Sequence, residues 1–286
     1  MTNVIDDLLD NPPAREQAET EAEWHDVWER HDLGQHAPEA MAVMGGLHAD
    51  RLAWVFVSGY QAAMIRCFPE LPLKGWAALA GSEDRHDPVQ HPGVRMVADG
   101  DGWRVNGFKS WVAQSANLDH LIITARAPGE EDKPRHAILL DARADGITLS
   151  HRAQPGYIVE MSQGFAQLDN VVVPEDGRLG DDRLRPFTRA EPAFIMLAGA
   201  ALLWTHARPD DTELRDGLRS VIHGLATVAA DPMRHPKDLA RMDLKLQKIL
   251  NDASEHPGIT SIPGWQADKQ LLSIYSPVLQ RRAARA

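Results

Sequence analysis

The hydrophobic period changes twice along the chain, and this change limits the fold more than any other feature of the sequence. Residues 1–75 carry apolar side chains at helical spacing, as in the run LAWVFVSGYQAAMIRC. Residues 76–182 contain short runs rich in β-branched residues between turn clusters such as DGDG, and helical spacing returns in residues 183–286. These two periods indicate helices and strands respectively. The order predicts an α+β fold: an N-terminal helical region, a middle antiparallel β-barrel and a C-terminal helical region.

Prolines divide the C-terminal region. We expect a helix that begins near Thr188, because Pro192 would then lie in its first turn, where a proline is tolerated. A last helix, in residues 267–286, would be kinked at Pro277. The apolar run AFIMLAGAALLW in the first of these helices needs cover on more than one face. This need predicts a homodimer or a hetero-complex with a fuller relative.

Composition excludes several classes of function. Acidic residues outnumber basic ones by 41 to 30, so no basic excess is available to neutralise the phosphates of a nucleic acid. The single cysteine excludes an internal disulfide and a cysteine-based zinc site, and the histidines show no metal-ligand spacing. No apolar run is long enough to span a bilayer, and the N-terminus does not have the pattern of a signal peptide. We expect a soluble, cytoplasmic protein that binds no metal, nucleic acid or membrane.

Three segments of the middle region together resemble one known family. They are AALAGSEDRHDP (77–88), DGWRVNGFKSWVAQSANLDHLIITAR (101–126) and FAQLDNVVVPEDGRLG (165–180). As an ordered set they resemble the acyl-CoA dehydrogenases, in which NG-K-W precedes a flavin-contacting segment and V-V-P followed by LG ends the β domain. The resemblance implies domains at 1–75, 76–182 and 183–286, FAD as the cofactor, and an acyl-CoA or another acyl thioester as the substrate.

The resemblance also implies two side-chain contacts to the flavin. Trp111 would lie against the ring system, since an aromatic face suits a flat π-system. Ser82 would contact the pyrophosphate. Without the resemblance, a buried barrel tryptophan and a turn-forming serine would be the preferred interpretation.

Two residues depart from the family pattern at the flavin. Ala80 and Ala113 stand where the family commonly has a threonine or serine, so two hydroxyl contacts to the ring are missing. Main-chain groups at Leu79 and Val112 would then make the contacts, because a backbone N–H does not depend on the side chain.

Removal of the α-proton of an acyl thioester requires a carboxylate whose pKa is raised toward the working pH by apolar surroundings. The family places this glutamate in one of two segments. In the terminal segment, Ser276 occupies its position, and a serine cannot act as this base unaided. In the segment FTRAEPAFIM, the position falls on Ala190, and Glu191 follows one residue later, about 100° around a helix. Glu191 is the catalytic candidate, and a first-turn carboxylate stabilised by the helix dipole is the alternative.

Two hypotheses follow. The first is an FAD-dependent oxidoreductase acting on CH–CH groups, which dehydrogenates an acyl thioester with hydride transfer to FAD. The second is a catalytically inactive homologue that acts as a binding or partner subunit. The replaced terminal glutamate and the two alanines favour the second hypothesis, whereas Glu191 favours the first. We expect the enzyme.

Overall fold

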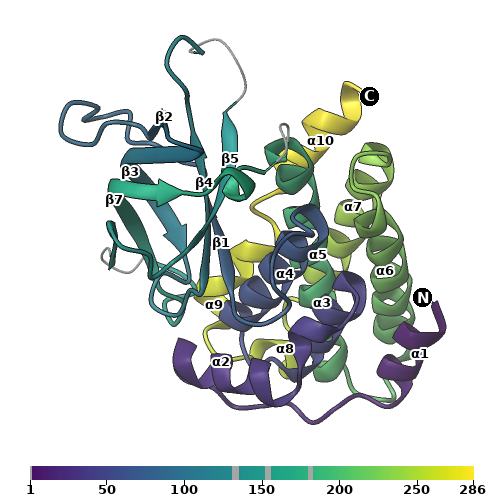
Figure 1. Cartoon of the computed structure of the whole chain (residues 1–286). Coiled ribbons are helices and arrows are strands. Elements are labelled where there is room, and N and C mark those ends of the chain that lie inside the picture. The colour runs from purple at the N-terminus through teal and green to yellow at the C-terminus, as the bar shows by residue number, and fades with distance from the viewer. Residues whose placement is uncertain (1, 131–134, 152–155, 180–182) are drawn as a thin grey trace. The chain divides into compact units, whose positions relative to one another are not determined.

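The computed structural model of the protein describes residues 2–130, 135–151, 156–179 and 183–286. The elements follow the predicted order of helices, strands and helices (Figure 1). The chain divides into two compact units. Unit 1 contains the N-terminal helices up to Cys67, the short segment around Tyr157, and the chain from Pro186 onward. Unit 2 contains the rest of the chain between Phe68 and Arg185.

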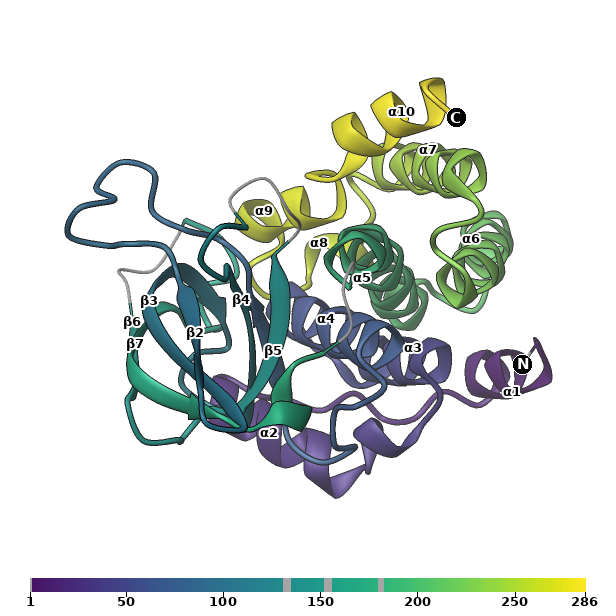
Figure 2. The same cartoon turned by 45° about the horizontal axis from the view of Figure 1, so that its top comes forward.

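Unit 1 is helical, and its long helix α5 runs between α3 and α4 on one side and α6 and α7 on the other (Figure 2). Its helices are α1 (Thr2–Asp10), α2 (Glu21–Arg30), η1 (Leu33–Gln35), α3 (Pro38–His48), α4 (Leu52–Cys67), α5 (Leu184–His206), α6 (Thr212–Ala230), α7 (Pro236–Asp252), α8 (Pro257–Thr260), α9 (Trp265–Asp268), η3 (Lys269–Leu272) and α10 (Ser276–Ala284). Throughout the described residues, each helix is too short or too polar to span a lipid bilayer.

The apolar run of α5 is covered within the chain itself. Every residue from Ala193 to Leu203 is buried. On one side α4 approaches closely at Gly59, where an added Cβ would lie 2.5 Å from the Cα of Ile195. Burial of this run therefore does not require a second chain, and the expectation of a dimer loses that argument.

The start of α5 was predicted wrongly. The helix begins at Leu184, so Pro192 lies in its interior rather than in its first turn. A proline there leaves the carbonyl oxygen four residues earlier without its helical N–H partner. That oxygen, on Thr188, accepts a hydrogen bond from Nη1 of Arg282 at 3.0 Å. A side chain from α10 thus compensates for the proline, which the local sequence of α5 does not reveal.

The last segment also differs from the prediction, because it is not one kinked helix. It forms α9, η3 and α10, and Pro277 is the second residue of α10. A proline in the first turn of a helix replaces an N–H that would have no partner within the helix. Pro277 therefore begins a helix instead of bending one.

Unit 2 is built on two sheets, ordered β1-β4-β5 and β2-β3-β7-β6. Its strands are β1 (Ala77–Ala80), β2 (Arg95–Asp99), β3 (Gly102–Ala113), β4 (His120–Ala125), β5 (His136–Asp141), β6 (Ile147–His151) and β7 (Gln163–Val173), and a 3-10 turn, η2 (Glu175–Gly177), follows β7. The β-rich middle region is confirmed. The antiparallel barrel is not, because neither sheet closes within the described residues and β1 pairs with β4 in parallel. The run AALA, which lacks β-branched residues, gave no strand signal for β1.

Candidate active site

Glu191 is enclosed in the helical core of unit 1. It lies on α5 directly before Pro192, and the neighbouring side chains of Phe187, Phe194 and Ile195 are buried. The residue as a whole is half-buried. Burial raises the pKa of Glu191 to about 7, although a hydrogen bond from Tyr275 works in the opposite direction. A carboxylate of this pKa is suited to general base catalysis near neutral pH.

The hydroxyl of Tyr275 donates a hydrogen bond to Oε1 of Glu191 at 3.3 Å. Tyr275 is the residue directly before α10. Burial raises the pKa of Tyr275 well above its usual value, and the charge of Glu191 raises it further. Tyr275 therefore stays protonated and remains a donor to the carboxylate over the whole physiological pH range.

The other two tyrosines of the chain, Tyr60 and Tyr157, lie near Tyr275, which donates to this carboxylate. Tyr60 is fully buried on α4, and its ring meets the ring of Phe187 edge-on, with centroids 5.4 Å apart. Tyr60 and Tyr157 both lie near enough to Tyr275 to add to the rise of its pKa. The surroundings of Glu191 are thus aromatic with hydroxyl groups, a combination that accommodates an apolar group and still offers hydrogen bonds.

A strained backbone holds the segment that carries Tyr157. The next residue, Ile158, has a φ of +44°, which is unfavourable for a β-branched side chain. Its N–H donates to Oδ1 of Asp268, which is 3% exposed, at 2.6 Å. Glu160 accepts from Nη1 of Arg51 at 3.0 Å. These two bonds fix the segment to the helices of unit 1.

Ser276 has a different partner from the carboxylate of Glu191. Its hydroxyl donates at 2.5 Å to Oδ1 of Asp243, a buried residue of α7. The amide of Gln280 donates to the other oxygen of Asp243 at 2.8 Å. These contacts fix α10 on α7, and they place Tyr275 rather than Ser276 on Glu191.

In unit 2, a β-bulge brings the two predicted flavin-contacting segments together. The register between β3 and β7 shifts between Lys109 and Val112, so Ser110 and Trp111 oppose a single residue. The N–H of Ser110 donates to the carbonyl oxygen of Ser82 at 3.0 Å. The indole N–H of Trp111, which is half-buried, donates to Gln163 at 3.0 Å. The remaining predicted contacts have buried side chains: Leu79, Ala80, Val112 and Ala113.

A polar hollow of about 570 Å³ lies beside Ser82. Arg85 and Arg135 line it together with two carboxylates, and the serine is exposed there. The carboxylates are those of Glu83, which pairs with Lys109, and Asp84, which pairs with His91. Gly81 leaves open space where a side chain would otherwise stand. Guanidinium groups and a hydroxyl around an open cradle fit the diphosphate of a dinucleotide. If FAD were bound, Ala80 and Ala113 would have no side-chain hydroxyl to offer its ring.

A buried ion pair supports this hollow from beneath. Lys109 is fully buried on β3, and its Nζ donates to Oε1 of Glu83 at 2.9 Å and to Thr124 at 2.8 Å. Burial lowers the pKa of Lys109 to about 8, against the opposing effect of Glu83. Arg135 pairs with the second carboxylate oxygen of Glu83 at 3.0 Å. The sequence does not indicate this role of Glu83, which only the fold reveals.

The N-terminal part of unit 1 contains a group that the sequence did not indicate. Nε2 of His31 lies 2.7 Å from Glu16, and Nδ1 of His48 lies 3.1 Å from the carbonyl oxygen of Ala14. The two imidazole rings stack with centroids 4.1 Å apart. Glu16, His31 and His48 each offer one ligand atom, and these atoms lie within 4.8 Å of one another, so the three residues form a candidate metal site.

Replacement of Glu191 by glutamine is expected to change how stability depends on pH. The folded-state pKa is about 7 against an ordinary 4.5, so the native protein binds more protons than the unfolded chain between these values. Its free energy of unfolding therefore falls as the pH rises through this window. Relative to wild type, Glu191→Gln should gain on the order of 3 kcal/mol between pH 4.5 and 8. Urea unfolding at several pH values measures the gain, and parallel curves would contradict it.

Removal of the Tyr275 hydroxyl should raise the pKa of Glu191 further, because that hydroxyl stabilises the ionised form. The carboxyl resonance of ¹³C-labelled glutamate should titrate at higher pH in Tyr275→Phe than in wild type. Tyr157→Phe is the matched control, since no bond joins that hydroxyl to Glu191 within the described structure. An unchanged titration in Tyr275→Phe would show that the 3.3 Å contact does not influence the carboxylate.

Neither a protein-family model nor a curated protein sequence matches the chain. Solved structures do match. An FAD-dependent dehydrogenase aligns with a TM-score of 0.70 and 14% identity, over 99% of this chain and 96% of that one. The prolyl acyl carrier protein oxidase AnaB aligns with a TM-score of 0.64 and 13% identity, over 92% and 89%. A glutaryl-CoA dehydrogenase from Mycobacterium smegmatis, solved with FADH2, aligns with a TM-score of 0.57 and 13% identity, over 99% and 92%. At these identities the likeness establishes the fold.

Proposed function

We propose that this chain, a divergent protein with the acyl-CoA dehydrogenase fold, is an FAD-dependent oxidoreductase that forms a double bond between the α- and β-carbons of an acyl thioester. The observation that carries the proposal is the carboxylate of Glu191, enclosed in the helical core, hydrogen-bonded by Tyr275 and with its pKa raised to about 7. A structural carboxylate at this place would more often have a cationic partner. Among the described residues, no cation pairs with Glu191.

In this proposal, Glu191 takes the α-proton of the thioester on one carboxylate oxygen. The C–H electron pair becomes the second bond between the α- and β-carbons, and the β-hydrogen leaves as hydride. FAD, when bound, would supply the acceptor for that hydride. Tyr275 holds the carboxylate in one orientation and stabilises its ionised form before the transfer. The apolar side chains around Glu191 limit water, which keeps the carboxylate basic.

The residues proposed to hold FAD come from β1, β3 and the hollow of unit 2. Ser82, Arg85 and Arg135 would bind the diphosphate. Trp111 would lie against the flavin ring. Because Ala80 and Ala113 carry no hydroxyl, main-chain groups of Leu79 and Val112 would make the polar contacts to the ring.

A flavin titration tests the proposal. Purified protein incubated with FAD should retain the flavin after gel filtration, and an acyl thioester should bleach its visible absorbance without oxygen. Protein that binds FAD but is not bleached by any acyl thioester would support the inactive-homologue hypothesis. Protein that does not retain FAD would exclude the proposed oxidoreductase, and the two alanines would then explain the weak binding.

A further inference from the structure

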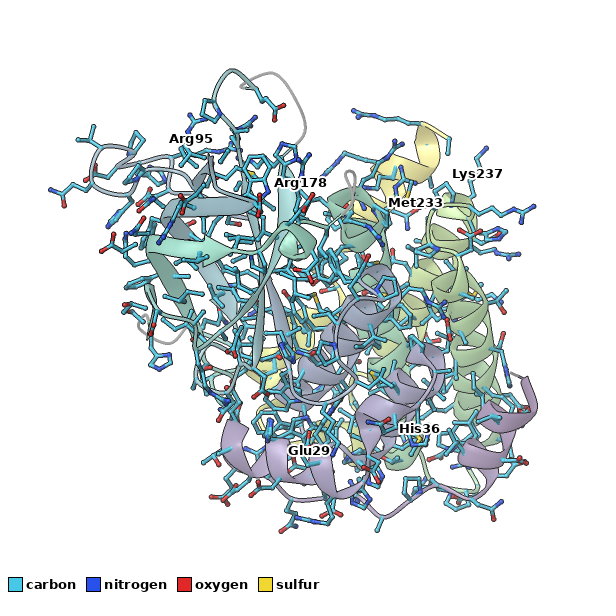
Figure 3. The ribbon with its side chains drawn as sticks, viewed as in Figure 1. Glu29, His36, Arg95, Arg178, Met233 and Lys237 are labelled. Atoms are coloured by element: carbon cyan, nitrogen blue, oxygen red, sulfur yellow. The ribbon has the colours of Figure 1, made fainter. Side chains whose placement is uncertain are left out.

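A group of cationic side chains at one end of unit 1 has no acidic partner in the part of the chain that the structure describes. We call it the basic end, and it consists of Arg189, Arg234, Lys237, Arg281, Arg282 and Arg285. Figure 3 labels Met233 and Lys237 at this end, beside α10. Within the described residues, no member of the basic end forms an ion pair. The basic end is unusual on a chain whose net charge is −11.

The centre of the basic end is a pair of arginines. Arg189 on α5 and Arg282 on α10 line a shallow depression together with Leu239 and Leu279. Arg282 is held there by the carbonyl oxygen of Thr188, at 3.0 Å, and not by a carboxylate. Burial lowers the pKa of Arg282, and the charge of Arg189 lowers it further. The fold thus holds two like charges together, an arrangement that an incoming anion would stabilise.

The other cations extend this centre over a wider area. Arg281 is exposed on α10, and Arg285 is exposed directly after the last residue of that helix. Residues 276–286 contain no acidic residue. On the neighbouring helix α7, Asp238 already pairs with Arg241 at 2.8 Å. The positive surface is therefore larger than a single phosphate group requires.

The basic end and the proposed catalytic carboxylate share their supporting elements. Arg189 precedes Glu191 by two residues on α5, and α10 begins directly after Tyr275. Two arginines of the basic end lie on α10 and a third, Arg285, directly follows it, and Arg282 follows Tyr275 by seven residues. A rise of 1.5 Å per residue separates them by about 10 Å along the helix. A partner that docks at this end would therefore stand close to the carboxylate.

We propose that the basic end is a docking surface for an acidic carrier protein that presents the acyl thioester on a phosphopantetheine arm. This inference rests on the proposed function. The wide positive surface suits an acidic protein domain, and the pair of Arg189 and Arg282 suits the phosphate at the base of the arm. The shared fold with a prolyl acyl carrier protein oxidase is consistent with such a partner.

Binding of a labelled holo acyl carrier protein from a type II fatty acid synthase, followed by fluorescence anisotropy, tests the inference without turnover. The wild-type protein should bind at low ionic strength and lose affinity as salt is added. Arg281→Glu combined with Arg285→Glu should weaken binding by at least about tenfold. Lys245→Glu combined with Lys248→Glu is the matched control, because it makes the same charge change at two exposed sites elsewhere on α7. Circular dichroism melting curves should show that both variants fold like the wild type.

Any of the following results would overturn the docking surface. The first is that the wild type does not bind the carrier protein, and the second is that the lysine control weakens binding as much as the arginine variant. The third is that the arginine variant dissociates a homodimer seen by sedimentation. An equal loss of affinity for free CoA would assign the arginines to a nucleotide and also overturn it. Failure of the proposed function gives a different result, namely carrier binding without bleaching of the flavin. Bleaching by an acyl-CoA without carrier binding would leave the function standing and remove the docking surface.

Discussion

Glu191→Gln is expected to lower the rate of flavin reduction by an acyl thioester at least about 10²-fold, the usual loss when a general base is removed. Glutamine has nearly the same shape as glutamate, and its amide oxygen still accepts the hydrogen bond that Tyr275 donates. The variant should therefore bind FAD and the thioester as the wild type does. Stopped-flow absorbance without oxygen measures the rate, and gel filtration measures flavin retention.

The control for this variant is Glu23→Gln. Glu23 is a carboxylate of the same unit that accepts backbone hydrogen bonds at the start of α2, so its loss should leave the rate unchanged. A Glu191→Gln variant that reduces flavin as fast as the wild type would exclude Glu191 as the base. The pH dependence of the free energy of unfolding of Glu191→Gln shows whether the variant still folds with a neutral side chain at this position.

Glu83→Ala is expected to lower the free energy of unfolding by about 4 kcal/mol, the range found when one partner of a buried ion pair is removed. The reason is that Lys109 is fully buried and would keep only Thr124 as an acceptor. Because burial already lowers the pKa of Lys109 to about 8, the variant should also shift the lysine further toward its neutral form. Urea unfolding at pH 7 measures the loss.

The matched rescue is a second substitution at Lys109. Lys109→Met removes the buried charge, so the double variant with Glu83→Ala should recover at least half of the lost stability. If Lys109→Met does not restore stability, the loss in Glu83→Ala comes from the hollow beside Ser82 and not from the unpaired lysine. The single variant Lys109→Met should also lose the rise in stability that the wild type shows from pH 8 to 10.5. In that window the unfolded lysine binds more protons than the folded one.

The pattern of hydrophobic spacing predicted the order of helices and strands, because each period reflects the face that a local segment buries. The strands from β2 to β7 were visible in this way, whereas β1 was not, since its four residues are alanine and leucine. Closure of the sheets could not be predicted. It depends on pairing between distant strands, and β1 pairs in parallel with a strand 43 residues later.

By itself, the sequence determined which chemical groups are available: an acidic residue, Glu191, beside Pro192, Ser276 in the last segment, and the alanines Ala80 and Ala113 in the two segments that resemble flavin-contacting ones. The identity of each residue is read from the sequence and does not depend on contacts between distant segments. Only the tertiary structure decided what each group does. It placed Tyr275 on Glu191, 84 residues away in the chain, and Ser276 on Asp243. A pKa depends on burial and on neighbouring donors, and both are set by segments that meet only after folding.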